Sequence, residues 1–417
     1  MKKLIFTSFI AAATFAQTHA QNPVNDSATL GAGYAKQTYY SLANGTKTTI
    51  DKTSWDIGFS VVNMDVTIIT NYGVTLWKSP VTNVDSAWNN TDTVGIDAWT
   101  KLYNSDTTWE NGAFNQGANG FDYGWGTYSM TTHKLTGNSV FIIKLHNGDY
   151  KKIIIREMNT TGVYTIEHAN IDGTNAITKT INKADYPNKN FVHYSISTDQ
   201  LINQEPNTAN WDLLFTQYYT LINAGTSVVN YGVSGVLTNK NTEIIKAENV
   251  NATNYVDYTN HTFTSQINTI GYDWKTYSNG TYVIADSTVY FVKDQANDIW
   301  KVLMTGFGGS STGDVHFSTL KLTTTDIKNA QQSIGKFSVY PNPAFNQPLH
   351  VVYELQHTAS ATTLRVYNVL GQVIYNTNLE NSTLNQITIP TNDWTPGNYI
   401  LEVMNQNGHA TQQVIIK

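Results

Sequence analysis

The chain carries one series of landmarks twice, which constrains its fold more than any other feature. The pattern Tyr-x-Trp-x-Thr-Tyr-Ser occurs at residues 123–129 and again at 272–278. Other landmarks recur in the same order, namely Tyr40-Ser41-Leu42 with Tyr194-Ser195-Ile196, Trp55-Asp56 with Trp211-Asp212, Asn71-Tyr72-Gly73-Val74 with Asn230-Tyr231-Gly232-Val233, and residues 140–144 with 289–293. A repeat this long is a whole domain and not a solenoid unit. The sequence therefore predicts two copies of one domain, residues 21–173 and 186–322, joined by a connector over residues 174–185.

Composition narrows the class of protein. Hydrophobic residues make up 40% of the chain and aromatic residues 12%, so sizeable cores can form. Charged residues are only 13%, about half the usual share, which suits an exported β-protein with a surface of Thr, Asn, Ser and Gln. The net charge of −6 argues against nucleic acid as a partner. The chain has no cysteine, which excludes disulfides, thiolate catalysis and iron–sulfur clusters.

The first twenty residues have the pattern of a secretory signal peptide. Lys2 and Lys3 precede an apolar run that ends near Ala16, and small residues at Thr18 and Ala20 form a cleavage site. We expect cleavage after Ala20. No later segment approaches the roughly 18 apolar residues of a membrane-spanning helix, so we expect no transmembrane segment in the mature chain.

Both copies are predicted to be built from β-strands. Residues 61–70, 140–144 and 153–155 are β-branched and apolar. Asn147-Gly148 is a strong hairpin signal, and residues 294–298 stand at the matching place in the second copy. No window shows a convincing helical stripe, and residues 323–335 are predicted to be a linker. The fold class is therefore all-β.

The last segment, residues 336–417, contains short strand patterns separated by Gly and Pro turns and suggests a small sandwich. Its Tyr-Pro-Asn-Pro, Val-Tyr-Asn-Val-Leu-Gly-Gln-Val and Pro-Gly-Asn-Tyr motifs resemble the type A C-terminal sorting domain of the type IX secretion system. The resemblance implies a small Ig-like β-sandwich that is recognised by the type IX translocon and sorting machinery. It also implies that the protein is secreted or held at the outer-membrane cell surface.

Each copy resembles the HmuY family of haem-binding proteins. The resemblance is carried by the two Trp-Asp landmarks, the Trp-x-x-Tyr-Ser element and the apolar hairpin that follows it. It implies two tandem HmuY-like β domains, in which a haem would be held between projecting strands by two axial ligands.

Met130 is the candidate haem ligand that the resemblance implies, because it directly follows Tyr128-Ser129. A methionine thioether is a credible axial ligand for haem iron. The same place in the second copy is Asn279, whose amide is not a credible ligand, and Asn279-Gly280 is predicted to form a turn. Residues 73–122 contain neither His nor Met, and His261 is the only candidate for a second ligand in the second copy.

Other residues offer alternatives. Repeated aromatic residues either line a ligand groove or form the duplicated core, and they are Trp55, Tyr123, Trp125 and Tyr128 with Trp211, Tyr272, Trp274 and Tyr277. His133 and His168 are weaker candidates for metal ligands. Gly309-x-Ser311-x-Gly313 fits a nucleophile elbow but lacks the following helix. Asp106, Glu110 and Asp122 could supply a hydrolytic carboxylate pair.

Three functions stay open. The first is a non-enzymatic exported protein that captures haem or a related ligand at the cell surface. The second is a surface module for glycans or proteins that has lost haem binding. The third is an enzyme built on the acidic residues. We favour the first, with no catalytic residues and no metal site.

Overall fold

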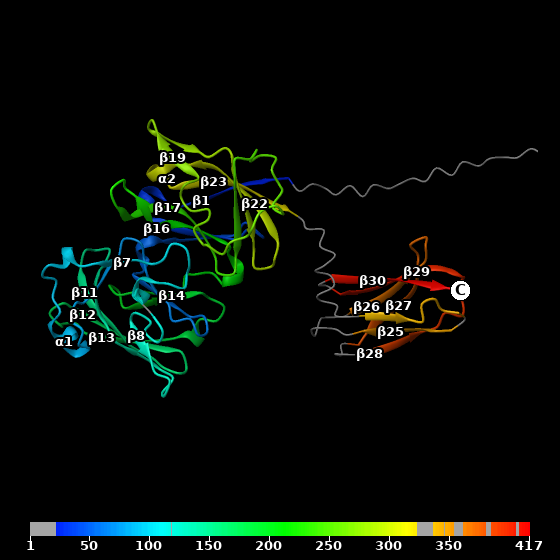
Figure 1. Ribbon diagram of the computed structural model, residues 1–417, viewed down its shortest axis with the longest axis horizontal. Coiled ribbons are helices and arrows are strands. Elements are labelled where there is room, and N and C mark those ends of the chain that lie inside the picture. Colours follow the sequence, from blue (N-terminus) through cyan, green and yellow to red (C-terminus); the bar gives the residue numbers. More distant parts are fainter. Residues whose placement is uncertain are drawn as a thin grey trace, which may run out of the picture. The chain divides into compact units, whose positions relative to one another are not determined.

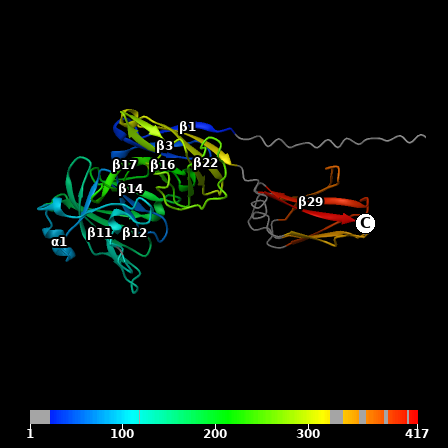
Figure 2. The same cartoon turned by 45° about the horizontal axis from the view of Figure 1, so that its top comes forward.

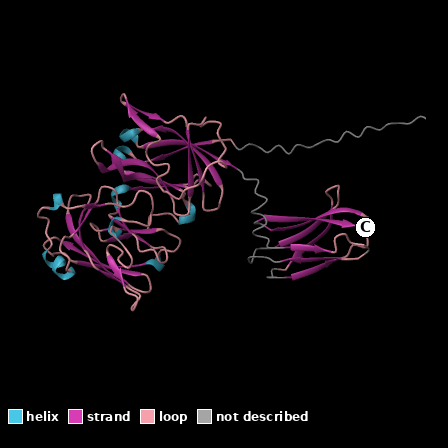
Figure 3. Ribbon diagram, in the orientation of Figure 1, coloured by secondary structure: helices cyan, strands magenta, loops and turns pink. Residues whose placement is uncertain are grey.

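The computed structural model describes residues 22–322 except Ala118, and residues 337–417 except Asn346, 354–361, 381–384 and 406–407. The expected signal peptide and the expected linker at 323–335 lie outside these residues. The chain divides into one unit that ends at Leu322 and a second that begins at Thr323. Strands dominate both units (Figure 3), which confirms the all-β prediction. The helical segments are short, and they are α1 (Val84–Asn90), α2 (Gly309–Thr312), η1 (Ala32–Tyr34), η2 (Lys52–Ser54), η3 (Ile96–Ala98), η4 (Ala113–Asn115), η5 (Lys183–Asp185) and η6 (Thr208–Asn210).

The first module of the larger unit consists of strands β4 to β15. One of its sheets has the order β13 (Ile177–Asn182), β12 (Val163–Asn170), β11 (Tyr150–Met158), β10 (Val140–Lys144), β6 (Thr75–Lys78) and β7 (Lys101–Leu102), extended by β8 (Gly126–Tyr128) and β9 (Leu135–Gly137). The other has the order β15 (Gln200–Ile202), β14 (Phe191–Ser195), β4 (Ile57–Ser60) and β5 (Ile68–Thr70). Both sheets contribute to one core, in which Trp125 is fully buried.

The second module combines the start of the chain with strands β16 to β23. One sheet has the order β1 (Val24–Thr29), β23 (Asp314–Leu322), β22 (Ile299–Phe307), β21 (Thr288–Lys293) and β18 (Glu243–Glu248). Another has the order β17 (Val228–Thr238), β16 (Leu213–Asn223), β2 (Lys36–Tyr40) and β3 (Lys47–Asp51). A separate hairpin consists of β19 (Lys275–Ser278) and β20 (Thr281–Ile284). Trp274 occupies the core here.

The two sequence copies exchange their first strands. β1, near the start of the chain, pairs along its whole length with β23 (Figures 1 and 2), and β2 pairs with β16. In return, β13 pairs with β12 and β14 pairs with β4. The packing units therefore differ from the expected domains at 21–173 and 186–322. Residues 174–185 are not a simple connector, because they contain β13, which pairs with β12 as β1 pairs with β23.

Hydrogen-bond patterns recur between the two modules. β10 and β11 form a hairpin across Asn147-Gly148, and β21 and β22 form one at the matching place, as the turn signals predicted. The β11–β12 ladder has a bulge between Ile155 and Glu157, and the β22–β23 ladder has one between Met304 and Gly306. A bulge redirects a strand and is a specific feature of a sheet. Its recurrence at matching places indicates that the two modules share this part of their structure.

The Trp-Asp landmarks hold the exchanged strands in place. Asp56 Oδ2 accepts a hydrogen bond from the Ile196 backbone N–H at 2.8 Å, and Asp212 Oδ2 accepts one from the Leu42 N–H at 2.7 Å. Each aspartate N–H also donates to a tyrosine carbonyl of the exchanged strand. Both aspartates are buried. We call these two arrangements the aspartate clasps, and each joins one sequence copy to the other.

One landmark pairing taken from the sequence is wrong. The Asn71 Nδ2 donates to the Trp55 carbonyl at 2.8 Å, and the Asn239 Nδ2 donates to the Trp211 carbonyl at 2.7 Å. Asn239, and not Asn230, is thus the structural counterpart of Asn71. The reason is that the β16–β17 hairpin is much longer than the β4–β5 hairpin, so a short motif matched by chance in its outer part.

The expected strand over residues 61–70 is also interrupted. Met64 has a φ of 64°, and the Asp65 N–H donates to the Val62 carbonyl at 3.2 Å, which forms a turn between β4 and β5. The Asp65 carboxylate then accepts the Thr67 N–H at 3.0 Å. These local side-chain bonds compete with strand pairing and leave only Ile68–Thr70 as β5.

The C-terminal unit is a β-sandwich in its described part. One sheet has the order β24 (Phe337–Tyr340), β25 (Leu349–Tyr353) and β28 (Asn385–Ile389). The other has the order β27 (Val373–Leu379), β26 (Thr362–Tyr367), β29 (Gly397–Asn405) and β30 (Gly408–Ile416). Leu349, Val351, Leu364 and Leu401 from both sheets meet in one core. Among the residues described in both units, no helix is long and apolar enough to cross a membrane.

The aspartate clasps lead to a stability prediction. Asp56→Ala and Asp212→Ala should each lower the free energy of unfolding of the larger unit by about 1–3 kcal/mol, because each leaves a buried backbone N–H without its acceptor. Urea unfolding of the mature chain, followed by tryptophan fluorescence, measures the loss. Asp97→Ala, at an exposed aspartate, is the matched control. Equal stability of clasp and control variants would contradict the role of the clasps.

Candidate functional site

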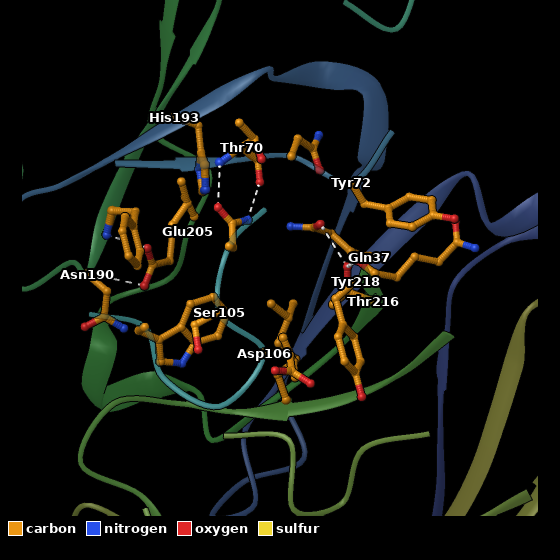
Figure 4. A pocket seen from close by; sticks show the side chains of 18 of the residues that line it. Gln37, Thr70, Tyr72, Ser105, Asp106, Asn190, His193, Glu205, Thr216 and Tyr218 are labelled. Atoms are coloured by element: carbon orange, nitrogen blue, oxygen red, sulfur yellow. Dashed lines mark hydrogen bonds between the residues drawn. The ribbon is translucent and has the colours of Figure 1, made fainter. Parts of the chain in front are cut away.

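A pocket lies between the two modules, where their four-stranded sheets approach each other. Its walls come from β2, β5, β14, β16 and β17, together with the loop at residues 104–111. A volume of ≈ 80 Å³ is open there to the centre of a water-sized sphere. Figure 4 shows the amide of Gln37 reaching toward the space that His193, Glu205 and Asp106 surround. The exchange of strands creates this site, because β2 and β14 are both exchanged.

Two pairs of rings form two walls of the pocket. Trp55 packs on His193 with ring centroids 4.2 Å apart, and Trp211 packs on Tyr39 at 5.0 Å. His193 and Tyr39 occupy matching places, because each directly precedes the Tyr-Ser landmark. Each pair thus joins the tryptophan of one sequence copy to a strand of the other.

Trp109 links the two walls. Its partly buried ring packs against the cluster of Trp55, Ile69 and Phe191 and also against the cluster that contains Trp211. Its Nε1 donates to the Thr238 carbonyl at 2.8 Å. The loop that carries Trp109 belongs to the first module.

Amide side chains fix the start of this loop. Asn104 accepts from the Thr70 N–H at 3.0 Å and donates to the Thr70 carbonyl at 2.7 Å, so it continues the sheet beyond the edge strand β5. Two residues further on, Asp106 accepts hydrogen bonds from Thr220 Oγ1 and from Asn268 Nδ2, the latter at 2.9 Å. The loop is therefore bonded to both modules.

Burial controls the ionisable groups of the pocket. It raises the pKa of Glu205 to about 7, even though the carboxylate accepts the Phe191 N–H at 2.7 Å and the Asn190 N–H at 3.3 Å. The Trp211 indole N–H lies near this carboxylate and lowers its pKa, but it makes no hydrogen bond of normal geometry. Burial, with a smaller contribution from Lys189, lowers the pKa of His193 to about 3, so this imidazole is neutral.

Several residues that line this pocket carry buried polar atoms without a partner. Among the described residues, eight buried side-chain nitrogen or oxygen atoms have no hydrogen-bond partner, and four belong to residues that line it. They are Trp55 Nε1, Trp211 Nε1, His193 Nδ1 and the Tyr218 hydroxyl, and the exposed fractions of these side chains are 5%, 3%, 2% and 9%. Buried polar atoms are normally paired. These four atoms are exceptions to that rule.

The structure places the predicted site residues in different environments. Trp55 and Trp211 line the pocket, whereas Trp125 and Trp274 are core residues. Met130 lies outside the pocket, 67% exposed in the turn between β8 and β9. Asn279, with a φ of 50°, occupies the β19–β20 turn, as the sequence predicted.

The predicted histidines are separate from one another. His133 is in the same turn as Met130, with its Nδ1 2.9 Å from the Tyr128 hydroxyl. His168 is buried against Tyr194, with its Nε2 2.8 Å from that hydroxyl. The His261 Nε2 lies 2.7 Å from the Tyr255 hydroxyl. Each imidazole has a tyrosine partner, and within the described residues no group of three His, Asp or Glu side chains could hold a metal ion.

The acidic residues do not form a hydrolytic pair. Asp122 bonds with Gly124 and Asn138, while Asp106 bonds across to the second module and Glu110 is exposed. Ser311 lies in the single helical turn α2 between antiparallel strands, which is not an elbow geometry.

Sequence reasoning missed several pocket residues, including Trp109, His193 and Glu205. Trp109 has no counterpart in the repeat, and no local motif distinguishes Glu205. His193 had one possible signal, because it directly precedes the repeated Tyr-Ser landmark.

Comparisons with known proteins identify two parts of the chain. Residues 33–168 match the family model of HmuY protein, and residues 338–417 match that of the secretion system C-terminal sorting domain. The larger unit therefore contains an HmuY domain, and the tail directs the protein through the type IX system to the exterior or the cell surface. The HmuY match ends within β12 and does not include the second sequence copy.

Comparisons with whole chains add little. No curated protein matches the chain. A biofilm-associated protein BSP domain aligns with 9% identity and a TM-score of 0.22, covering 99% of this chain and 84% of its own. A fungal alcohol oxidase in complex with copper aligns with 11% identity and a TM-score of 0.17, covering 95% and 96%. TM-scores this low do not indicate a shared fold.

The raised pKa of Glu205 predicts a pH-dependent stability. The carboxyl holds its proton more tightly in the folded state than in the unfolded state, where its pKa is 4.5. The stability it contributes is complete below that value and is lost as pH rises through about 7. Between about pH 5 and pH 8 the wild type should lose about 2–3 kcal/mol relative to Glu205→Gln.

Urea unfolding of both proteins across this pH range measures the difference. Glu110→Gln, at the exposed carboxylate next to Trp109, is the matched control. Parallel pH curves for the wild type and Glu205→Gln would contradict the raised pKa of Glu205.

Proposed function

We propose that the protein is an exported, non-enzymatic binding protein that holds a small ligand in the pocket between the two modules. The observation that carries this proposal is the set of four unpartnered buried polar atoms on Trp55, Trp211, His193 and Tyr218. Each such atom costs on the order of 1–3 kcal/mol when its partner is missing. A ligand that supplies the partners recovers this free energy.

The ionisable groups of the pocket favour binding over catalysis. His193 is neutral at physiological pH, and a general base works best with a pKa near the working pH. Both oxygens of Glu205 already accept backbone N–H groups, which fixes the carboxyl in place. We therefore assign His193 and Glu205 to holding the ligand; the pKa of Glu205, about 7, would also suit a general base.

We also propose that the larger unit consists of two HmuY-like copies. The HmuY match to residues 33–168 supports the first copy. The matching bulges in β11 and β22 and the paired aspartate clasps of Asp56 and Asp212 support the second. The second copy has diverged most in the β16–β17 hairpin, which is extended.

Haem is the ligand that the family resemblance implies, but these residues do not fit it well. A six-coordinate haem needs donors on opposite faces of the ring, whereas Met130 and His133 lie in one turn. Asn279 offers only an amide at the matching turn. The central pocket is too small, since ≈ 80 Å³ is well below the roughly 300–1,000 Å³ of sites for larger ligands. We therefore propose a smaller ligand.

A haemin titration tests this conclusion. We expect no saturable shift of the Soret band that depends on Met130, so the wild type and Met130→Ala should give the same spectra. Met64→Ala, at another exposed methionine, controls for nonspecific contact with thioethers. A saturable shift in the wild type and in Met64→Ala that is lost in Met130→Ala would establish haem binding instead.

The pocket itself is tested by thermal shift with a library of small metabolites. Compounds that bind should stabilise the wild type and should stabilise the Trp55→Phe/Trp211→Phe variant less, because two N–H donors are removed. A library with no stabilising compound, or compounds that stabilise both proteins equally, would contradict the proposed function.

A further inference from the structure

We propose that the ligand of the central pocket is a single neutral sugar ring, either a free monosaccharide or the terminal residue of a glycan. This inference rests on the proposed function and specifies its ligand class. It follows from four properties of the pocket: the kind of unpartnered atom, the aromatic walls, the charge and the size.

The unpartnered atoms require a ligand that carries oxygen acceptors. An indole N–H only donates, so Trp55 needs an acceptor, whereas Trp211 Nε1 lies near the Glu205 carboxylate. The Tyr218 hydroxyl and the neutral His193 can each donate or accept. A hydroxyl group meets both demands, because it has one donor and two acceptor lone pairs. Several hydroxyls on one small molecule fit this set of partners.

The walls require apolar faces on the same molecule. Trp55, Trp211, Trp109 and Tyr39 present aromatic rings to the pocket from both modules. A ring that carries its hydroxyls at the edge and C–H groups on its faces contacts both kinds of surface. Gln37 adds an amide whose Oε1 accepts from Thr216 at 3.3 Å, and Figure 4 places that amide near the middle of the space.

The charged groups at the pocket already have neutral polar partners, which favours a neutral ligand. Lys52 donates to Gln217 and lies over the Tyr72 ring, 4.9 Å from its centroid. Asp106 is bonded to Thr220 and Asn268. A charged ligand would have to compete with these partners and would lose its hydration.

The space limits the ligand to one small ring at most, because the pocket volume is only ≈ 80 Å³. Tyr72, which lines the pocket, stacks on Tyr219 with ring centroids 4.8 Å apart, and Tyr103 meets Tyr219 edge-on at 4.9 Å.

Titrations of the mature protein with methyl glycosides of glucose, galactose, mannose and N-acetylglucosamine test the inference. Tryptophan fluorescence or calorimetry provides the readout. Oligosaccharides that end in the best monosaccharide distinguish a glycan end from a free sugar by their relative affinities. Neutral amino acids and glucuronate are the comparison ligands.

We expect saturable binding of at least one neutral sugar. Trp55→Phe and Trp211→Phe should each weaken it by about threefold to tenfold, the effect of one neutral hydrogen bond. Trp77→Phe is the matched control, because Trp77 Nε1 is also buried and unpartnered but lies outside the pocket. If a tryptophan variant fails to fold, Gln37→Leu tests the same site without changing an aromatic ring.

The outcomes separate the two levels of the proposal. Pocket-dependent binding of amino acids or glucuronate, and of no neutral sugar, would overturn the sugar inference and leave the proposed function standing. Sugar binding that the pocket variants do not weaken, or that Trp77→Phe weakens equally, would place the sugar elsewhere and overturn the inference. Binding of no small molecule in any class would overturn both.

Discussion

The exchange of first strands between the sequence copies is the constraint on which the larger unit depends. β1 completes a sheet whose other strands begin more than two hundred residues later, and β14 returns to pair with β4. Asp56 and Asp212 hold these exchanged segments through buried hydrogen bonds. Neither module has a complete core until the other copy supplies its strands, so the two modules depend on each other.

The same exchange gives the two modules matching frameworks, but the pocket between them is lined by unlike residues. Trp55 and Trp211 occupy matching places, but their partners His193 and Tyr39 differ in chemistry. Trp109 enters from one copy alone. Because the clasps and the cores carry the stability of the fold, the residues that face the pocket could diverge after duplication. A pocket lined by unlike residues can recognise an asymmetric ligand.

Local signals in the sequence predicted local structure well. The repeat and the Asn147-Gly148 turn indicated strands and hairpins, because both depend on nearby residues. The strand exchange could not be predicted, since pairing between distant strands leaves no mark in a local pattern. Only part of the pocket could be predicted from the sequence. Trp55 and Trp211 stood out as repeated residues, whereas the role of Glu205 depends on burial that only the fold creates.

Unpaired polar atoms in a folded protein need an explanation, and their distribution supplies one here. A sequence that folds well satisfies its buried donors, and exceptions concentrate at functional sites. Trp77 shows that one such exception can be tolerated in a core. Four around one cavity would together cost several times the roughly 1–3 kcal/mol of a single unpaired group. A ligand that paired them would convert this cost into affinity, which is the physical basis of the binding function that we propose.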